Sequence, residues 1–161
     1  MRRTRPAVAS AGGRRKGVLM LETTSLEFGE LREAEIEAAV ALWREAGLLR
    51  PWNDPRADIR LARAGPSSAI IAARTEGRLA ATVMVGWDGH RGWIYYLAVA
   101  RDLRRQGIGA RMVKAAEDWL AQRGAPKLNL LVRAENEAVL GFYESLGYRR
   151  SDAVLLQRVL R

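Results

Sequence analysis

The stretch Leu103–Met112, LRRQGIGARM, combines residue types that can bind phosphate with the start of a helical pattern. Arg104 and Arg105 come just before Gly107 and Gly109. A helix N-terminus attracts anions because its first backbone N–H groups are unpaired and it carries partial positive charge. Glycines remove the Cβ atoms that would keep a phosphate away from the backbone. The stretch therefore predicts a diphosphate cradle, and a basic turn without a ligand is the alternative.

Other phosphate and metal chemistries do not fit the sequence. No Gly-Lys-Ser/Thr follows the glycines, so the stretch is not a magnesium-binding P-loop, and it lacks the G-x-G-x-x-G spacing of dinucleotide sites. The chain has no cysteine and one histidine, His90. These counts exclude a disulfide framework, a thiol nucleophile, and zinc sites built from cysteines or several histidines. We expect no metal.

Positive charge is concentrated in residues 1–19. The formal net charge is +9, and this stretch holds six basic residues and no acid, which leaves +3 for the rest. Blocks of like charge are normally solvated, and the stretch has no apolar core typical of a signal peptide. We expect an inert tail or a start assigned ahead of Met20, with a nucleic-acid-binding arm or a targeting peptide as alternatives. Nucleic acid is not an expected partner of the folded body.

The length of 161 residues suits one domain with one hydrophobic core. No apolar run approaches the roughly 20 residues that cross a bilayer. We therefore expect a soluble, cytoplasmic protein without a membrane partner, in which the folded domain covers residues 20–161.

Periodicity predicts the elements that position the glycine stretch. Helical spacing of apolar residues predicts a helix over 33–46, and Asp54 and Pro55 provide the N-cap and first residue of a second helix. Three apolar runs separated by glycine-bearing turns predict an antiparallel meander over 68–99. The remaining predicted elements are a first strand near 21–28, a helix after Gly107, a strand at 127–132, a helix capped by Asn136, and a last strand at 153–160.

This order of elements predicts an α/β (α+β) fold with a mixed sheet covered by helices. The strand–helix–strand segment 93–132 should form a right-handed crossover between two parallel strands. Ligands of open sheets bind at the carboxyl ends of strands where the connections diverge. The residues RRQGIG, 104–109, lie at that end.

Two motifs together resemble a known family. Arg104-x-x-Gly107-x-Gly109 follows YYLAV, and NEAVLGFYESLGY begins about thirty residues later. They resemble the GNAT superfamily of acyl-CoA-dependent N-acetyltransferases over roughly residues 26–160. RPWNDP and DGHRG are similar to a YpeA-like bacterial branch. The resemblance implies the GNAT fold and acetyl-CoA as co-substrate.

The resemblance also implies roles for particular residues. Backbone amides after Arg104 would hold the pyrophosphate of acetyl-CoA with help from the Arg104 side chain, and the strand before them would pair with the pantetheine arm. Tyr143 would lie near the sulfur as the catalytic acid. The implied acetyl-CoA-binding residues are Leu97, Ala98, Val99, Arg104, Arg105, Gln106, Gly107, Ile108, Gly109, Ala110 and Asn136.

Acetyl transfer to an amine needs a neutral amine and a proton for the departing thiolate. Many family members carry a glutamate base where this chain reads Trp93 and Ile94, so the base stays open among Tyr95, Tyr96, Asp88 and His90. We expect direct transfer of acetyl to a primary amine of a small molecule, a protein N-terminus or a lysine. The alternative is a non-catalytic acyl-CoA-binding regulatory module. Whether the chain forms a homodimer is also left open.

Overall fold

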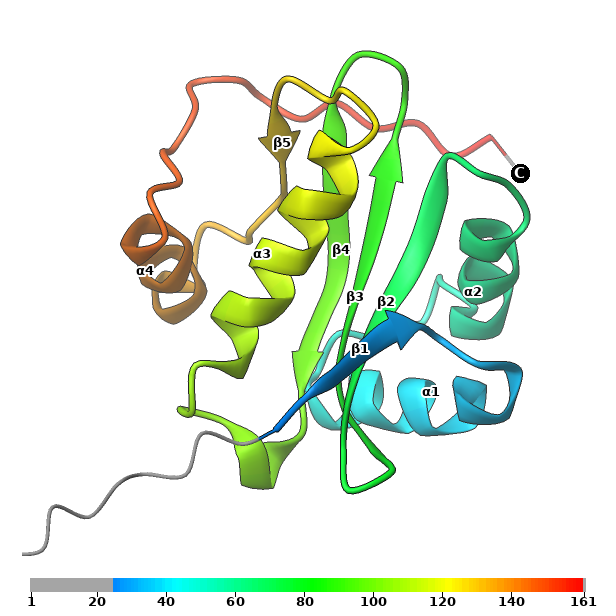
Figure 1. The fold of residues 1–161 in the computed structure, drawn as a ribbon. Helices are drawn as coiled ribbons and strands as arrows, with labels where there is room; N and C mark the ends of the chain where they lie inside the picture. Colours follow the sequence, from blue (N-terminus) through cyan, green and yellow to red (C-terminus); the bar gives the residue numbers. More distant parts are fainter. Residues whose placement is uncertain (1–24, 161) are drawn as a thin grey trace, which may run out of the picture.

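The structure is a computed structural model that describes residues 25–160, so the expected tail at 1–19 lies outside the described residues. A five-stranded sheet in the order β1-β2-β3-β4-β5 lies between two helical layers (Figure 1). Within the described part, no helix is long and apolar enough to cross a membrane. The elements are β1 (Glu27–Glu30), η1 (Glu33–Glu35), α1 (Ile36–Glu45), α2 (Pro55–Arg63), β2 (Ser68–Thr75), β3 (Arg78–Trp87), β4 (Gly92–Val99), η2 (Arg101–Leu103), α3 (Ile108–Ala121), β5 (Leu128–Asn129) and α4 (Glu137–Ser145).

The predicted meander is confirmed. Strands β2, β3 and β4 are antiparallel neighbours, and β1 adds antiparallel to the outer edge of β2. The β2–β3 turn places Glu76 and Gly77 at φ values of 50° and 74°, and glycine adopts this region without a steric penalty.

Alternation along the strands gives the sheet two apolar faces. In β2, Ala69 and Ile71 face the core under α3 and α4, whereas Ile70 and Ala72 face the core under α1 and α2. The α2 helix begins as predicted, because the Asp54 side chain accepts a hydrogen bond from the Arg56 amide at 2.9 Å and Pro55 is the first helical residue. Both faces of the sheet are therefore covered, as Figure 1 shows.

A bulge interrupts β4. Thr82 of β3 pairs with Ala98, and Met84 pairs with Tyr95, so Tyr96 and Leu97 together lie opposite one residue of β3. Tyr96 has a φ of 50°, which is unusual for a bulky side chain. No local pattern in the sequence predicts this bulge.

The predicted parallel crossover is confirmed, but its two strands separate soon after they begin to pair. Strand β5 pairs with β4 only through Gly92 with Leu128 and Trp93 with Asn129. Strand β4 continues to Val99, whereas β5 ends at Asn129. The carboxyl-terminal half of β4 therefore has no strand partner on its β5 side within the described residues.

Three strand predictions need correction. The strand predicted at 127–132 is only two residues long, and β1 begins at Glu27, later than predicted, while residues 21–24 lie outside the described part. The last strand predicted at 153–160 is absent, and its apolar side chains are exposed. An apolar pattern favours a strand, but a strand also needs a hydrogen-bonded neighbour. Residues 153–160 pair with no strand in the described structure.

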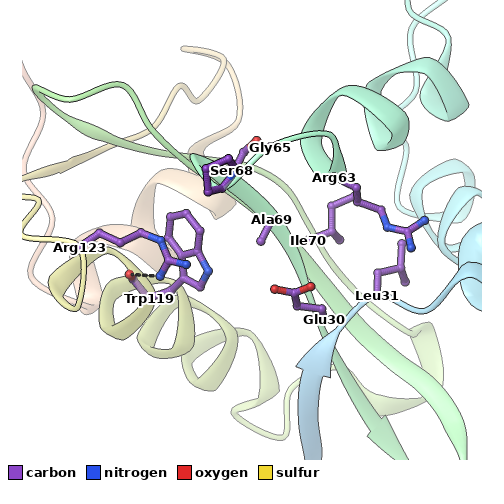
Figure 2. Close-up of a pocket in the computed structure, with 10 residues that line it drawn as sticks. Glu30, Leu31, Arg63, Gly65, Ser68, Ala69, Ile70, Trp119 and Arg123 are labelled. Carbon is purple, nitrogen blue, oxygen red and sulfur yellow. Dashed lines mark hydrogen bonds between the residues drawn. The ribbon is translucent and has the colours of Figure 1, made fainter.

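A hollow of about 210 Å³ lies where β1 leaves the edge of β2. Figure 2 shows Trp119 of α3 and Arg123, just beyond its end, on one side and Arg63 on the other. The Arg123 guanidinium lies over the Trp119 ring at 3.5 Å, and it donates to the Trp119 carbonyl oxygen at 3.1 Å. The hollow lies near the carboxyl end of α3, whereas the glycine stretch forms the opposite end of that helix.

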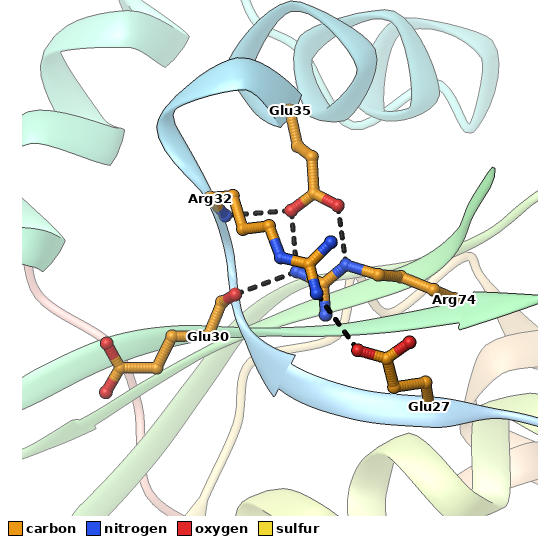
Figure 3. Close-up of polar contacts among 5 residues, drawn as sticks. All are labelled: Glu27, Glu30, Arg32, Glu35 and Arg74. Carbon is orange, nitrogen blue, oxygen red and sulfur yellow. Dashed lines mark hydrogen bonds and ion pairs between the residues drawn. The ribbon is translucent and has the colours of Figure 1, made fainter. Parts of the chain in front are cut away.

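A buried ion pair joins β2 to the start of α1. The Arg74 side chain is 2% exposed, and its Nε and Nη2 atoms donate to the two carboxylate oxygens of Glu35 at 2.5 and 2.6 Å (Figure 3). Arg74 also donates to the Glu30 carbonyl oxygen at 2.8 Å, and Glu35 accepts from the Arg32 amide at 2.8 Å. The pair therefore fixes the segment between β1 and α1 against the sheet.

Candidate active site

The start of α3 carries a row of backbone amides that precede its hydrogen-bond ladder. Arg105 and Gly107 have φ values of 65° and 76°, and Gly107 is the N-cap of α3. The amide of Arg111 donates to the Gly107 carbonyl oxygen at 3.2 Å. The amides of the three residues before Arg111 therefore precede the intrahelical ladder. Left-handed residues next to a helix start turn successive N–H groups toward one side, which makes an anion-binding concavity.

The two glycines of the stretch serve different purposes. A Cβ on Gly107 would meet no atom within 4 Å, so the space beside it is open. A Cβ on Gly109 would lie 3.3 Å from Cζ of Phe142, which is tight. Both glycines were predicted to leave room for the phosphate, but Gly109 also has a structural reason, because it lets α3 approach α4 closely.

The arginines beside this concavity are exposed. The Arg104 side chain turns back to β4, where its Nε donates to the Val99 carbonyl oxygen at 3.0 Å. Asp102 of η2 pairs with Arg78 at 2.7 Å and lies on the same connection. The connection therefore contacts the end of β4 through Arg104 and the start of β3 through Asp102.

The open side of β4 presents backbone groups beside the concavity. The Ala100 amide donates to the Ala80 carbonyl oxygen at 2.8 Å. Antiparallel pairs alternate between hydrogen-bonded and non-hydrogen-bonded, so the Val99 backbone groups face away from β3 and toward the side that β5 leaves. Ala98 is different, since it is buried in the core under α1 and α2 and its backbone faces β3.

Tyr143 and Asn136 lie on and just before α4. Asn136 caps the helix as predicted, with its side chain accepting from the Val139 amide at 3.3 Å. Tyr143 is 8% exposed, and its ring packs in T-shaped geometry against Phe142 and Tyr148 at centroid distances of 5.0 and 5.5 Å. Burial raises the pKa of Tyr143 to about 12. Its phenol is therefore protonated at neutral pH, which is the form that a proton donor needs.

The four candidate bases lie in or next to β4. The Asp88 carboxylate accepts hydrogen bonds from within its own turn and from the start of β4. It accepts from the amides of His90 and Arg91 at 2.8 and 2.6 Å and from the Trp93 indole at 3.0 Å. These hydrogen bonds, the one from Arg91 first, lower the pKa of Asp88 to about 2. His90 is an exposed residue of the same turn.

The two tyrosines do not have the charge state of a base at neutral pH. Burial raises the pKa of Tyr95, and burial and then a hydrogen bond to Asp58 raise the pKa of Tyr96 to about 12. Both phenols are therefore protonated at neutral pH.

The structure also brings together residues that the sequence analysis did not connect. The Tyr96 hydroxyl donates to Asp58 Oδ2 of α2 at 2.7 Å, and the Trp43 indole of α1 donates to Thr82 Oγ1 of β3 at 2.8 Å. These pairs are 38 and 39 residues apart in the chain. The periodicity of α1 marks Trp43 as a core residue, but no local pattern predicts which strand residue it meets.

Comparison with known proteins decides the family. A family model described as "Acetyltransferase (GNAT) family" matches residues 30–148. The chain belongs to the GNAT acetyltransferase family. This confirms the resemblance found in the two motifs, and the mixed sheet between helices is the GNAT fold.

Similar proteins agree with this assignment. An acetyltransferase of Pectobacterium atrosepticum is 40% identical over 135 residues, which cover 84% of this chain and 96% of that protein. An acetyltransferase of Yersinia enterocolitica is 38% identical with the same coverage of both chains. These names favour the enzyme over the non-catalytic acyl-CoA-binding module.

Solved structures share the fold across low sequence identity. The aminoglycoside acetyltransferase AAC(6')-Iy, in complex with a CoA-containing bisubstrate analogue, has a TM-score of 0.72 at 14% identity and covers 84% of this chain and 98% of that one. The ribosomal-protein-S18-alanine N-acetyltransferase of Escherichia coli has a TM-score of 0.68 at 26% identity, with 79% of each chain covered. This GNAT protein is an acetyl-CoA-dependent N-acetyltransferase.

Proposed function

We propose that this GNAT enzyme transfers acetyl from acetyl-CoA to a primary amine by direct attack, with the donor held between the start of α3 and the open side of β4. The observation that carries the proposal is the early divergence of β5 from β4, next to the row of amides that opens α3. A ligand with a diphosphate at one end and an extended amide-containing arm matches both features.

The pyrophosphate would lie against the amides of Arg105, Gln106, Gly107, Ile108, Gly109 and Ala110. The open space beside Gly107 supports this position, because a phosphate can approach the backbone there. The Arg104 and Arg105 side chains would add positive charge from the exposed rim. Arg104 already contacts the Val99 carbonyl oxygen, so its guanidinium would lie between the phosphate and the strand.

The pantetheine arm would pair with the open side of β4. Val99 turns its N–H and C=O groups to this side, and Leu97 lies two residues earlier on the same strand. An extended amide chain would add there as a further strand does in β-augmentation. Ala98 would make no backbone hydrogen bond to the arm, because its N–H and C=O groups face β3. Asn136, at the start of α4, would face the arm from the α4 side.

In the reaction the amine nitrogen attacks the thioester carbonyl carbon, the carbon–sulfur bond breaks, and the thiolate takes a proton. We assign this proton to Tyr143, whose hydroxyl is protonated at neutral pH. The attacking nitrogen releases one proton to water as the amide forms, and the Tyr143 phenolate takes a proton back from water. The amine must lose a proton before attack. Trp93 and Ile94 occupy the positions where many family members carry a glutamate, so we propose that water relays this proton to solvent.

The acceptor belongs to the class of primary amines. The relatives of this fold include an enzyme that acts on the S18 alanine and one bound to an acetylneamine analogue. Both acceptors present a primary amine that is a cation in water. A panel that compares aminoglycosides, small polyamines, peptides with an N-terminal alanine, and lysine peptides distinguishes these classes.

The test is release of CoA from acetyl-CoA in the presence of each amine. We expect turnover with at least one class, and a Tyr143→Phe enzyme that is slower by about 10²- to 10⁴-fold. Tyr148→Phe is the matched control, because it removes a hydroxyl from the same aromatic cluster. The Tyr148 hydroxyl donates to Glu117 at 2.8 Å. Acetyl-CoA binding without turnover on any amine would refute the proposal, and full activity of Tyr143→Phe would refute the role of Tyr143.

A further inference from the structure

The bulge of β4 is held by side chains that the proposed reaction does not use. Tyr96 keeps a left-handed φ of 50°, and such a conformation persists in a bulky residue only where the surroundings fix it. The surroundings of Tyr96 come from three elements: α1, α2 and β3. Strained residues with this kind of support cluster at functional sites.

Each of these elements contacts Tyr96, and the side chain of Asn53, just before α2, also makes a hydrogen bond to the Tyr96 hydroxyl. Its ring stacks on the Trp43 ring of α1, with 4.0 Å between centroids and 13° between planes. Its carbonyl oxygen accepts from Thr82 Oγ1 of β3 at 3.4 Å, and its hydroxyl donates to Asp58 Oδ2 of α2 at 2.7 Å. The Asp58 contact is shorter than the one from Thr82, and hydrogen bonds to a charged carboxylate are stronger than neutral ones.

The bulge determines which way the following backbone points. Side chains and backbone groups alternate with a period of two along a strand, so one extra residue reverses the direction of everything after it. Leu97 and Val99 follow Tyr96 directly. If Tyr96 relaxed and β4 straightened, these two residues would turn different groups toward the side that β5 leaves.

We propose that Asp58 is a positioning residue that acts through Tyr96 to hold the β4 bulge, and thereby orients the backbone of Leu97 and Val99 toward the thioester. This inference rests on the proposed function. Asp58 contacts neither the donor site at α3 nor the reacting atoms, and its effect passes through one hydrogen bond. The carboxylate keeps the bulge in place while acetyl is transferred.

The test measures kcat and, separately, the affinity for acetyl-CoA by calorimetry in Asp58→Ala, Tyr96→Phe and the double variant. We expect each single variant to lower kcat by about 10- to 100-fold, because a misplaced reacting group costs this much. Affinity for acetyl-CoA should fall by a smaller factor than kcat, because the diphosphate still meets the unchanged start of α3 and only the pairing of the arm with Leu97 and Val99 is disturbed. The double variant should be no slower than Tyr96→Phe, because that variant already lacks the hydrogen bond to Asp58.

Two further variants separate positioning from stability. Asp58→Asn keeps an acceptor oxygen for the tyrosine hydroxyl and should restore most of kcat. Glu37→Gln is the matched control, because it also replaces a carboxylate in the α1–α2 layer, where Glu37 pairs with Arg56 at 2.6 Å, and it should keep the wild-type kcat. Tyr96→Phe retains the stacked ring, so it carries the test if Asp58→Ala does not fold.

Wild-type kcat in Tyr96→Phe, or single effects that multiply in the double variant, would overturn the inference. An equal loss in Asp58→Asn and Asp58→Ala would do the same. A wild-type enzyme that binds acetyl-CoA but acetylates no amine would refute the proposed function, and the inference with it. Normal wild-type turnover with unaffected variants would refute the inference alone.

Discussion

Replacing Glu35 with alanine should strongly destabilise the protein. The change leaves the Arg74 guanidinium, which is 2% exposed, without the two carboxylate oxygens that it contacts at 2.5 and 2.6 Å. It also removes the acceptor of the Arg32 amide. Breaking a buried pair on one side costs about 3–5 kcal/mol of unfolding free energy. At about 2.1 cal/mol/K of unfolding entropy per residue, a domain of about 140 residues would lose about 10–17 °C in Tm.

The assay is thermal unfolding followed by circular dichroism, with Glu27→Gln as the control. Glu27 pairs with Arg32 in the same cluster, but both side chains are at least 60% exposed, and exposed pairs contribute about 0–1 kcal/mol. The control should therefore shift Tm by less than about 3 °C. A Glu35→Ala protein within about 3 °C of wild type would refute the reasoning that this pair anchors α1.

The pH dependence of stability gives an independent check on this pair. The hydrogen bond from Arg74 is the largest cause that lowers the pKa of Glu35 below its ordinary value of 4.5. A carboxylate with a lowered folded-state pKa contributes its full stability above the unfolded-state pKa and loses it as pH falls through the folded-state pKa. The difference in unfolding free energy between wild type and Glu35→Gln should therefore be constant at neutral pH and shrink below about pH 4.5. A difference that stays constant down to pH 3 would contradict the assignment.

Three further predictions concern the donor site and its chemistry. Gly107→Asn should weaken acetyl-CoA binding by about 10-fold or more, because it places a side chain in the open space beside the amides, and asparagine tolerates a left-handed φ. The control is Gly124→Asn, at φ 78° beyond the other end of α3, which should bind acetyl-CoA like wild type in calorimetry. Equal affinities of the two variants would contradict the cradle. kcat/KM should rise with pH as the amine loses its proton, and it should not fall below about pH 10, because the pKa of Tyr143 is raised to about 12. A decrease in kcat/KM near pH 8 that disappears in Tyr143→Phe would contradict this. Arg104→Met should weaken acetyl-CoA binding and flatten its dependence on salt, because one cation near the phosphates is lost; an unchanged salt dependence would place Arg104 outside the site.

Local signals in the sequence predict the elements that carry the site. The meander, the crossover through α3, and the caps at Asp54 and Asn136 were all predicted, because apolar period, glycine turns and capping residues act over a few neighbouring positions. The glycine stretch was placed at the carboxyl end of β4 for the same reason. The structure shows in addition that Gly109 lies close to Phe142. This is a contact between two helices, and no local sequence pattern predicts it.

The features that the sequence does not predict depend on contacts between residues far apart in the chain. The bulge at Tyr96 depends on Trp43, Thr82 and Asp58, which come from three other elements. The last strand was wrongly predicted from an apolar pattern, because the pattern does not say whether a neighbouring strand is within reach. The buried Arg74 was also missed, since an arginine in a strand is normally a surface residue and its partner lies 39 residues earlier.

Backbone hydrogen exchange with and without CoA tests most directly where this acetyltransferase holds its donor. We predict that CoA slows exchange at the amides of residues 105–110 and at Leu97 and Val99, because these N–H groups gain hydrogen-bond acceptors. Unchanged exchange at all of these amides, with protection instead around Trp119 and Arg123 at the hollow beside β2, would contradict the account.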